Sequence, residues 1–196
     1  MDALGRLRIF VLGKAREVVA FRDAPAAASE TLVKATDLSL YRIVYFATHG
    51  LVSGEIAALA EPALALTIPK EPTDLDDGLL TASEVAQLKL NADWVVLSAC
   101  NTASGDTPGA EALSGLARAF FNAGARALLV THWRVDSQAA VRLTTQTFAA
   151  LQKDPSIGRA EGLRRAMLAH IDDTATPWNA YPSYWGAFAV VGEGRR

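Results

Sequence analysis

The sequence predicts an α/β fold in which helices cover both faces of a largely parallel central sheet. Several short, almost continuously apolar runs are typical of strands that are buried on both faces. Segments with helical periodicity alternate with these runs, which is the order expected of β–α–β units. With 196 residues, of which 51% are hydrophobic and 20% charged, the chain has the size and composition of one globular domain.

The first 80 residues contain apolar runs that predict strands and one segment that predicts a helix. The run at 41–48 is almost continuously apolar, as in a strand that helices cover on both sides. Residues 29–36 have a short helical pattern, and Ser29 is a suitable N-cap. The connection after residue 67 is rich in Pro and Asp, which places it at the surface. The predicted strands lie at residues 8–13, 17–21, 41–48 and 63–67.

The alternation of helix and strand continues through the rest of the chain. Thr81 and Glu84 have the three-residue spacing of a capping box, so a helix begins there. A later helix ends at Gly124, because glycine readily adopts the left-handed conformation that follows a helix. In chain order, the predicted elements are a helix at 81–90, a strand at 93–99, a helix at 110–124, a strand at 125–133, helices at 137–153 and 156–171, and a strand at 184–194.

Charge, cysteine content and hydropathy exclude several classes of protein. The formal net charge is −2 and basic residues are scattered, so nothing indicates binding to nucleic acid or to an anionic membrane. One cysteine excludes an internal disulfide framework and is compatible with a reducing compartment. No leader is visible, and no apolar run approaches the roughly 20 residues that span a bilayer. We therefore expect a cytoplasmic protein, and no motif indicates a metal ion or a cofactor.

Two of the predicted strands end at a side chain that is capable of chemistry, namely His49 and Cys100. The carboxyl ends of parallel strands meet at one edge of a sheet, where ligands bind in open α/β folds. A thiol becomes a good nucleophile when a neighbouring imidazole assists its deprotonation. Taken singly, each residue also has a structural interpretation, because lone cysteines are commonly buried as small apolar side chains. Gly50 and Asn101, which directly follow them, favour a Cys–His dyad at a strand edge over a buried core.

Other conspicuous residues have simpler interpretations. His132 follows a strand and precedes Trp133, so we expect it in a pocket wall rather than as a base. His170 lies near a helix end, where a positive charge interacts favourably with the helix dipole, so we expect a structural role. Residues 73–78 are acidic but lack the spacing of a calcium loop, which predicts a solvated turn. Core packing is expected for the aromatic cluster Trp178, Tyr181, Tyr184 and Trp185.

Five segments of the chain carry a family resemblance. They are YRIVYFATHG (41–50), EPALALT (61–67), DGLLTASEVAQLKLNADWVVLSACNTASGD (77–106), GAEALSGLARAFFNAGARALLVTHWRVDSQAA (109–140) and YPSYWGAFAVVGEG (181–194). Together they resemble the CHAT domain, a caspase-like cysteine protease module, whereas residues 1–40 match it only loosely. The resemblance implies a caspase-like three-layer α/β/α sandwich and a single CHAT domain over residues 1–196. Members of this family typically form the C-terminal part of longer bacterial proteins with tetratricopeptide repeats, so we expect the same here.

The resemblance also implies an activity, that of a cysteine endopeptidase with a thioester intermediate. His49 is then the general base and Cys100 the nucleophile, and no metal or cofactor is needed. The backbone N–H groups of Gly50 and Cys100 are expected to form the oxyanion hole. The expected partners are a protein or peptide substrate and tetratricopeptide-repeat modules or a regulatory protein. Without such a module or protein, the domain is expected to be weakly active or latent.

The expected substrate-binding residues are Asn101, Trp133, Arg134 and Asp136. The segment 131–138 resembles one that, in separase-like relatives, contributes an acidic residue to bind a substrate arginine. Asp136 then binds Arg or Lys at P1, the residue before the scissile bond, because a guanidinium pairs bidentately with a carboxylate. Alternatively, Asp136 only caps the helix that begins at Ser137. If Arg134 points inward instead, the pocket selects an acidic residue; we favour a basic one.

Two further functions remain open at the level of sequence. A fold does not establish its chemistry, so the chain is alternatively a catalytically silent CHAT scaffold or a regulatory interaction module. An acyl transferase or a different thiol hydrolase with the same dyad is the other alternative. The presence of both His49 and Cys100 favours the endopeptidase.

Overall fold

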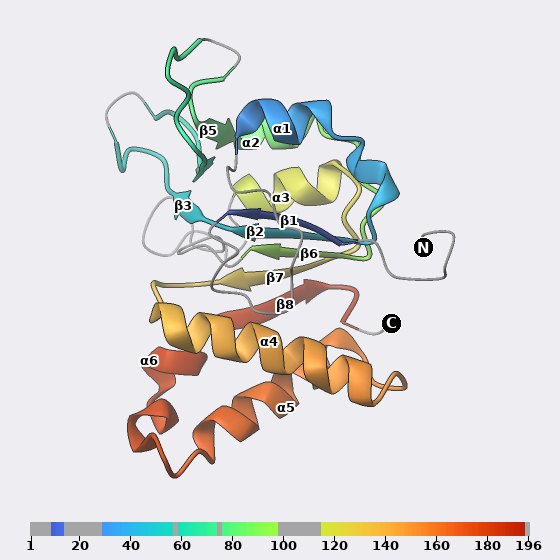
Figure 1. Cartoon of the computed structure of the whole chain (residues 1–196), viewed down its shortest axis with the longest axis vertical. Helices are drawn as coiled ribbons and strands as arrows, with labels where there is room; N and C mark the ends of the chain where they lie inside the picture. Colours follow the sequence, from blue (N-terminus) through green and yellow to red (C-terminus); the bar gives the residue numbers. More distant parts are fainter. Residues whose placement is uncertain (1–8, 14–28, 57–58, 74–75, 98–114, 195–196) are drawn as a thin grey trace.

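A five-stranded sheet lies at the centre of the molecule (Figure 1). In spatial order its strands are β1 (Ile9–Gly13), β2 (Ile43–Ala47), β6 (Trp94–Leu97), β7 (Ala127–Thr131) and β8 (Phe188–Gly192). The first four strands are parallel, and β8 is antiparallel to β7. The structure, a computed structural model, describes residues 9–13, 29–56, 59–73, 76–97 and 115–194. The predicted strand at 17–21 and the start of the predicted helix at 110–124 lie outside these ranges.

Helices form a layer on each face of this sheet. The helices on one face are α1 (Glu30–Ala35), α2 (Ala82–Val85) and α3 (Gly115–Asn122), with the 3-10 helix η2 (Leu38–Leu40). Those on the other face are α4 (Ser137–Lys153), α5 (Arg159–Ile171) and α6 (Pro182–Trp185), with the 3-10 helix η3 (Pro177–Ala180). The three layers, visible edge-on in Figure 1, confirm the predicted α/β/α sandwich with a largely parallel sheet.

Side chains of the central strands alternate between the two helical layers. Phe46 of β2 packs against Phe120 of α3, with the ring centroids 5.3 Å apart. On the opposite face, Trp94 of β6 packs against Phe148 of α4 at 5.0 Å. Because successive side chains of a strand point to opposite faces, a strand between two helical layers needs apolar residues at every position. This requirement for apolar residues on both faces explains the continuous apolar runs in the sequence.

A second, three-stranded antiparallel sheet lies beside the carboxyl end of β2 (Figure 1). Its strands are β3 (His49–Leu51), β4 (Ala63–Ala65) and β5 (Leu79–Thr81). β4 lies in the centre, and its register pairs His49 with Ala65 on one side and Ala65 with Leu79 on the other. Only β4 corresponds to a strand predicted from the sequence, so this sheet is an addition to the expected architecture.

The predicted helix boundaries agree with the structure at two places and differ at a third. The capping box of Thr81 and Glu84 is formed, with both reciprocal hydrogen bonds present. Gly124 adopts a φ of +109°, as expected of the residue that follows a helix. The helix predicted at 81–90 is shorter than expected and ends at Val85. The backbone N–H of Leu90 donates to the carbonyl of Ala123 at 2.8 Å, so this segment is bonded to the end of α3 instead.

Candidate active site

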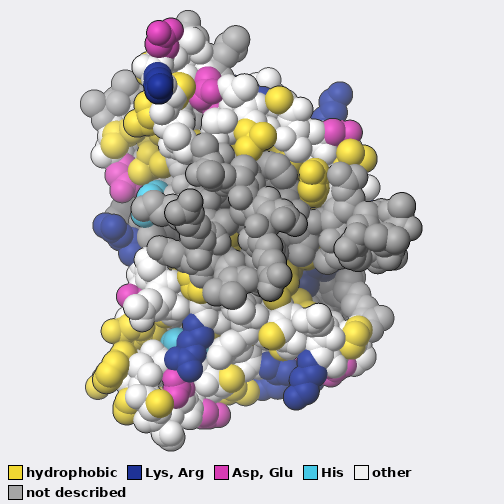
Figure 2. Space-filling model, in the orientation of Figure 1, with side chains coloured by type: hydrophobic (Ala, Val, Ile, Leu, Met, Phe, Trp, Pro, Cys, Tyr) yellow, Lys and Arg dark blue, Asp and Glu magenta, His cyan; other side chains and the backbone are white. Residues whose placement is uncertain are grey.

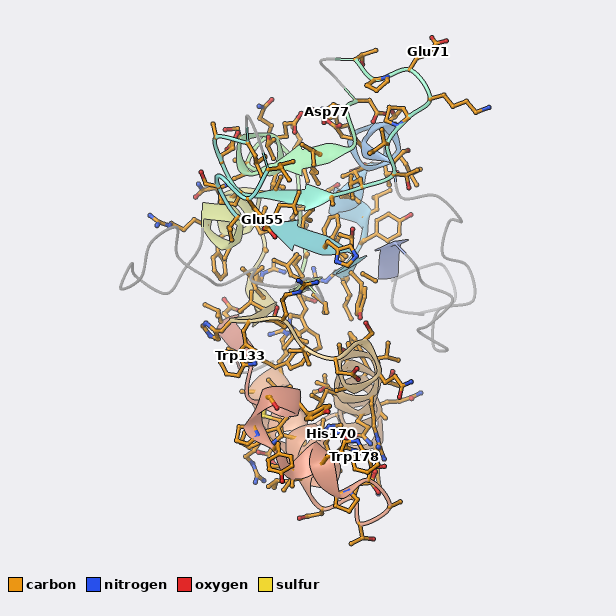
Figure 3. The ribbon with its side chains drawn as sticks, turned by 90° about the vertical axis from the view of Figure 1, so that its left-hand side faces the viewer. Glu55, Glu71, Asp77, Trp133, His170 and Trp178 are labelled. Atoms are coloured by element: carbon orange, nitrogen blue, oxygen red, sulfur yellow. The ribbon has the colours of Figure 1, made fainter. Side chains whose placement is uncertain are left out.

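The carboxyl ends of β2, β6 and β7 lie at one edge of the central sheet. Figure 1 shows these three strands pointing in the same direction, and Figure 3 looks onto this edge. In the ladders, Phe46 is level with Leu97 and Val96 is level with Leu129, so the strands end at similar heights. The chain that leaves each strand therefore enters a common region, where α/β sheets bind their ligands.

His49 lies at this edge with an exposed side chain. It is the first residue of β3 and follows the end of β2 by two positions. Gly50, the next residue, is buried, so the backbone turns inward while the imidazole stays accessible. The structure thus places His49 at the carboxyl edge of the sheet, where the sequence predicts it. An accessible imidazole can exchange a proton with a bound substrate, which a core histidine cannot do.

Thr48 is a residue of this region that the sequence interpretation missed. Its hydroxyl group donates a hydrogen bond to the backbone carbonyl of Ala65 in β4. Ala65 is also the residue that faces His49 across the β3–β4 ladder. The signal in the sequence was a β-branched hydroxyl residue between a strand end and a histidine. Nothing in the local sequence indicates that its hydrogen-bond acceptor lies 17 positions away.

Cys100 and Asn101 lie outside the residues that the structure describes. β6 is described up to Leu97, three positions before Cys100. Its last residue is level with Phe46, one position before the end of β2. The distance between the thiol and the imidazole, and the pairing of the Gly50 and Cys100 amides in an oxyanion hole, therefore stay predictions.

The segment that follows β7 carries His132 and Trp133 to the same edge. The backbone N–H of His132 donates to the carbonyl of Ala187 at 3.0 Å, which ties this segment to the start of β8. Trp133 is 43% exposed and lies against Gly186, where an added Cβ would be 3.6 Å from the indole. Figure 3 shows Trp133 below β3, on the side of α6. Trp133 thus provides an exposed aromatic surface beside the strand ends, whereas His132 is half-buried.

Asp136 caps α4. Its carboxylate Oδ1 accepts hydrogen bonds from the backbone N–H groups of Gln138 and Ala139, both at 3.0 Å. The capping role considered from the sequence is therefore present. Asp136 and Arg134 are both exposed, and a role of either in binding substrate stays a prediction.

His170 is structural, as expected, but not for the expected reason. It is only 1% exposed inside the layer of α4 and α5, and neither ring nitrogen has a hydrogen-bond partner among the described residues. Burial lowers the pKa of His170, and the positive charge of Arg142 lowers it further. The neutral imidazole is therefore favoured. The structural role of His170 thus comes from its burial between helices and not from an interaction of a positive charge with the helix dipole.

The expectation of core packing is wrong for two residues of the C-terminal aromatic cluster. Trp178 is 55% exposed and Tyr181 is 66% exposed, both at η3. In the space-filling view, apolar side chains gather over η3 and α6 (Figure 2). Tyr184 and Trp185 are partly buried instead, and the Trp185 Nε1–H donates to the carbonyl of Ala180 at 3.2 Å. The short helices η3 and α6 leave one side uncovered, so aromatic residues there cannot all reach the core.

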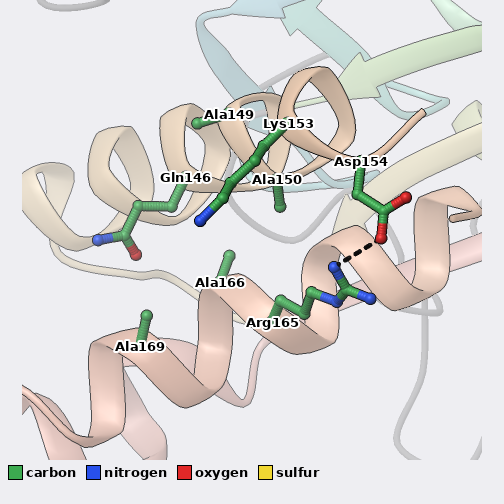
Figure 4. A pocket seen from close by; sticks show the side chains of 8 residues that line it. All are labelled: Gln146, Ala149, Ala150, Lys153, Asp154, Arg165, Ala166 and Ala169. Atoms are coloured by element: carbon green, nitrogen blue, oxygen red, sulfur yellow. Dashed lines mark hydrogen bonds and ion pairs between the residues drawn. The ribbon is translucent and has the colours of Figure 1, made fainter. Parts of the chain in front are cut away.

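Two grooves of the described surface lie away from His49. One of about 570 Å³ lies between α4 and α5, on a floor of alanines that includes Ala149 and Ala166 (Figure 4). The ion pair of Asp154 and Arg165 lies at one end of it. Another groove, of about 510 Å³, lies between α1 and α2. Neither of the two is lined by a residue of the predicted site.

The described ranges contain neither a cluster of potential metal ligands nor a helix that could span a membrane. Within them, no three His, Cys, Asp or Glu side chains come close enough together to hold a metal ion. In the same part of the chain, no helix is both long and apolar enough to cross a bilayer.

Comparisons with known proteins place this geometry in context. Residues 7–193 match the CHAT domain family. The chain is 30% identical over 118 residues to Tetratricopeptide repeat protein 28 of Mus musculus, which covers 58% of this chain and 4% of that protein. Its fold is similar to the crystal structure of the Arg-specific cysteine proteinase gingipain R, with a TM-score of 0.52 and 13% identity. That likeness covers 87% of this chain and 36% of gingipain R.

Proposed function

Because the chain belongs to the CHAT domain family, we propose that it is a cysteine endopeptidase with a dyad of Cys100 and His49. The observation that carries the proposal is the exposed imidazole of His49 at the carboxyl edge of the sheet. The last residue of β6 before the segment of Cys100 is level with Phe46, one position before the end of β2, which leads to His49. The caspase-like fold, which gingipain R shares at low identity, is compatible with this chemistry.

In the proposed mechanism, the Cys100 thiolate attacks the carbonyl carbon of the scissile bond. The negative charge that develops on the carbonyl oxygen is stabilised by the backbone N–H groups of Gly50 and Cys100. His49 delivers the thiol proton to the leaving amine, and the C–N bond breaks to give a thioester on Cys100. His49 then removes a proton from a water molecule, which attacks the thioester and releases the carboxylic acid and the thiol.

The proposed substrate is a polypeptide with a basic residue at P1. Gingipain R is described as Arg-specific, and Asp136 is the acidic candidate of this chain at the same edge. Trp133 offers an exposed aromatic wall, and Arg134 and Asn101 are the remaining proposed contacts. Tetratricopeptide-repeat modules or a regulatory protein are the proposed partners, since the mouse relative is a tetratricopeptide repeat protein.

Cleavage of reporter peptides tests the proposal most directly. Peptides with Arg, Lys, Asp or Leu at P1 are compared with the wild-type protein, Cys100→Ala and His49→Ala. We expect the wild type to cleave the Arg peptide at a low rate in the absence of a partner, and both variants to lose detectable turnover. His170→Gln is the matched control, because this histidine is buried in the layer of α4 and α5, away from the strand edge, and it should retain activity.

Thermal unfolding of the same variants separates a nucleophile from a core cysteine. A thiol at a strand end contributes little packing, so Cys100→Ala should leave the melting temperature almost unchanged. A core cysteine would lose about 1 kcal/mol or more of unfolding free energy on the same change. Unaltered cleavage by Cys100→Ala contradicts the mechanism. A folded wild type that neither cleaves any of the peptides nor forms a thioether with an Arg-containing acyloxymethyl ketone favours the silent scaffold instead.

A further inference from the structure

We propose that Thr48 is a positioning residue that fixes the imidazole of His49 by bonding the β2–β3 junction to β4. The inference deepens the proposed function and rests on it, because it assigns how the general base is held. Thr48 itself touches no reacting atom in this proposal. It acts through the backbone conformation of the residue that follows it.

The chain passes from one sheet to the other within a single residue. β2 ends at Ala47 in the central sheet, and β3 begins at His49 in the small sheet. In Figure 1, the chain leaves the end of β2 and continues directly into β3 of the small sheet. Thr48 alone forms the junction, so the direction in which the imidazole leaves the backbone depends on its conformation. The hydroxyl group of Thr48 bonds this junction to β4, so it can hold the conformation.

The carbonyl group that accepts the hydrogen bond from the Thr48 hydroxyl belongs to a strand that is paired on both sides. Ala65 lies in β4, the centre strand of the small sheet, paired to β3 on one side and to β5 on the other. Its neighbour Leu64 is completely buried in the core shared with α3. A hydrogen bond to this carbonyl therefore ties the junction to a rigid part of the molecule.

The imidazole of His49 has little else to fix it within the described residues. It is exposed, and in that part of the chain no side-chain hydrogen bond to it is formed. A general base must be held close to its productive position, since a displacement of about 1 Å can cost about a hundredfold in rate. The backbone must then supply the positioning. Among the described residues, the Thr48 hydroxyl and the pairing of His49 with Ala65 are the contacts that do so.

Two substitutions at Thr48 test this role, with one matched control elsewhere. Thr48→Val keeps the β-branched shape and removes the hydroxyl, whereas Thr48→Ser keeps the hydroxyl. Thr145→Val is the control: the Thr145 hydroxyl also donates to a backbone carbonyl, that of Val141 at 2.7 Å, and is also part-buried. Peptide cleavage is measured across pH for kcat and KM, and the His49 ring signals are followed by NMR in the full chain.

We expect Thr48→Val to lower kcat about tenfold to a hundredfold while KM changes by less than about twofold. The acidic limb of its pH profile should shift, and the His49 ring signals should broaden or move. Thr48→Ser and Thr145→Val should behave as the wild type. The NMR readout does not depend on turnover, so it separates this inference from the proposed function. Unchanged His49 signals in Thr48→Val overturn the inference, even if the wild type cleaves peptides. Changed His49 signals in a chain that never cleaves leave the positioning intact and overturn the proposed function.

Discussion

Asp136 has two candidate roles, and substitution by asparagine separates them. Its Oδ1 caps α4 by accepting two backbone hydrogen bonds at 3.0 Å. The same carboxylate is the proposed partner of a basic P1 residue. The side-chain carbonyl of asparagine accepts the same capping bonds, since Asn and Asp are similarly good N-caps. Asparagine has no negative charge, however, and cannot form an ion pair with a substrate arginine.

The expected size of each effect follows from the geometry. Asp136→Ala removes both capping bonds and should cost about 1 kcal/mol of unfolding free energy. For a chain of this size, that corresponds to a melting temperature lower by about 2–4 °C. Asp136→Asn keeps the bonds and loses only the interaction of the charge with the start of α4, worth about 0.3–1 kcal/mol at an exposed position. The asparagine variant should therefore be the more stable of the two.

Calorimetry and reporter peptides together measure both effects. If Asp136 binds the P1 side chain, both variants should lose the preference for Arg over Leu by about tenfold or more, the value of one charge-assisted hydrogen bond. Asp37→Asn is the control, because Asp37 caps η2 through Ser39 with the same chemistry, and it should not alter the preference. An asparagine variant that keeps the full preference for Arg refutes the P1 role and leaves Asp136 as a cap alone. An Asp preference that disappears in Arg134→Ala would assign the pocket to Arg134.

Two further predictions concern stability. His170 has a lowered pKa in the folded protein, so it contributes stability that is present above the unfolded pKa of about 6.5 and lost as the pH falls toward the lower folded value. His170→Gln should remove this pH-dependent loss of stability, which for one proton is at most about 1.4 kcal/mol per pH unit. The measurement is the free energy of unfolding of both proteins between pH 7 and 5. The same pH dependence in the two proteins would argue against the prediction. Gly124→Ala should destabilise the protein by more than about 1 kcal/mol, because φ is +109° and a Cβ would lie 2.4 Å from the carbonyl oxygen of Leu90. Gly54→Ala is its control in chemical denaturation, since φ is +78° there but nothing lies within 4 Å of the added Cβ; equal losses in the two variants would rule out the steric part of the argument.

The central sheet could be predicted because its pattern is local and redundant. Residues 43–47, 94–97 and 127–131 are apolar at nearly every position, and strands between two helical layers require this. The strands β3 and β5 could not be predicted in the same way. Each has three residues, and each is stabilised by pairing with β4 rather than by its own composition.

In the candidate site, too, features that depend on local interactions could be predicted from the sequence, whereas features that depend on distant contacts could not. The cap formed by Asp136 was foreseeable, because it bonds to residues two and three positions later. The position of His49 at the sheet edge was also foreseeable, because parallel strands share their carboxyl edge. The bond from Thr48 to Ala65 was not, and neither was the burial of His170, since both depend on elements that meet only in the folded chain.

The two residues of the proposed dyad belong to different parts of this architecture. His49 is part of the small antiparallel sheet, whereas Cys100 follows β6 of the central sheet by three residues. Their alignment therefore depends on how the small sheet is attached to the central one, and Thr48 forms that attachment on the β2 side. A partner that moved the small sheet would displace the base and leave the strand leading to the nucleophile in place. Because Leu64 of β4 and Leu80 of β5 belong to the core shared with α3, such a movement would also repack part of that core, so the proposed activity and the stability of the domain should change together.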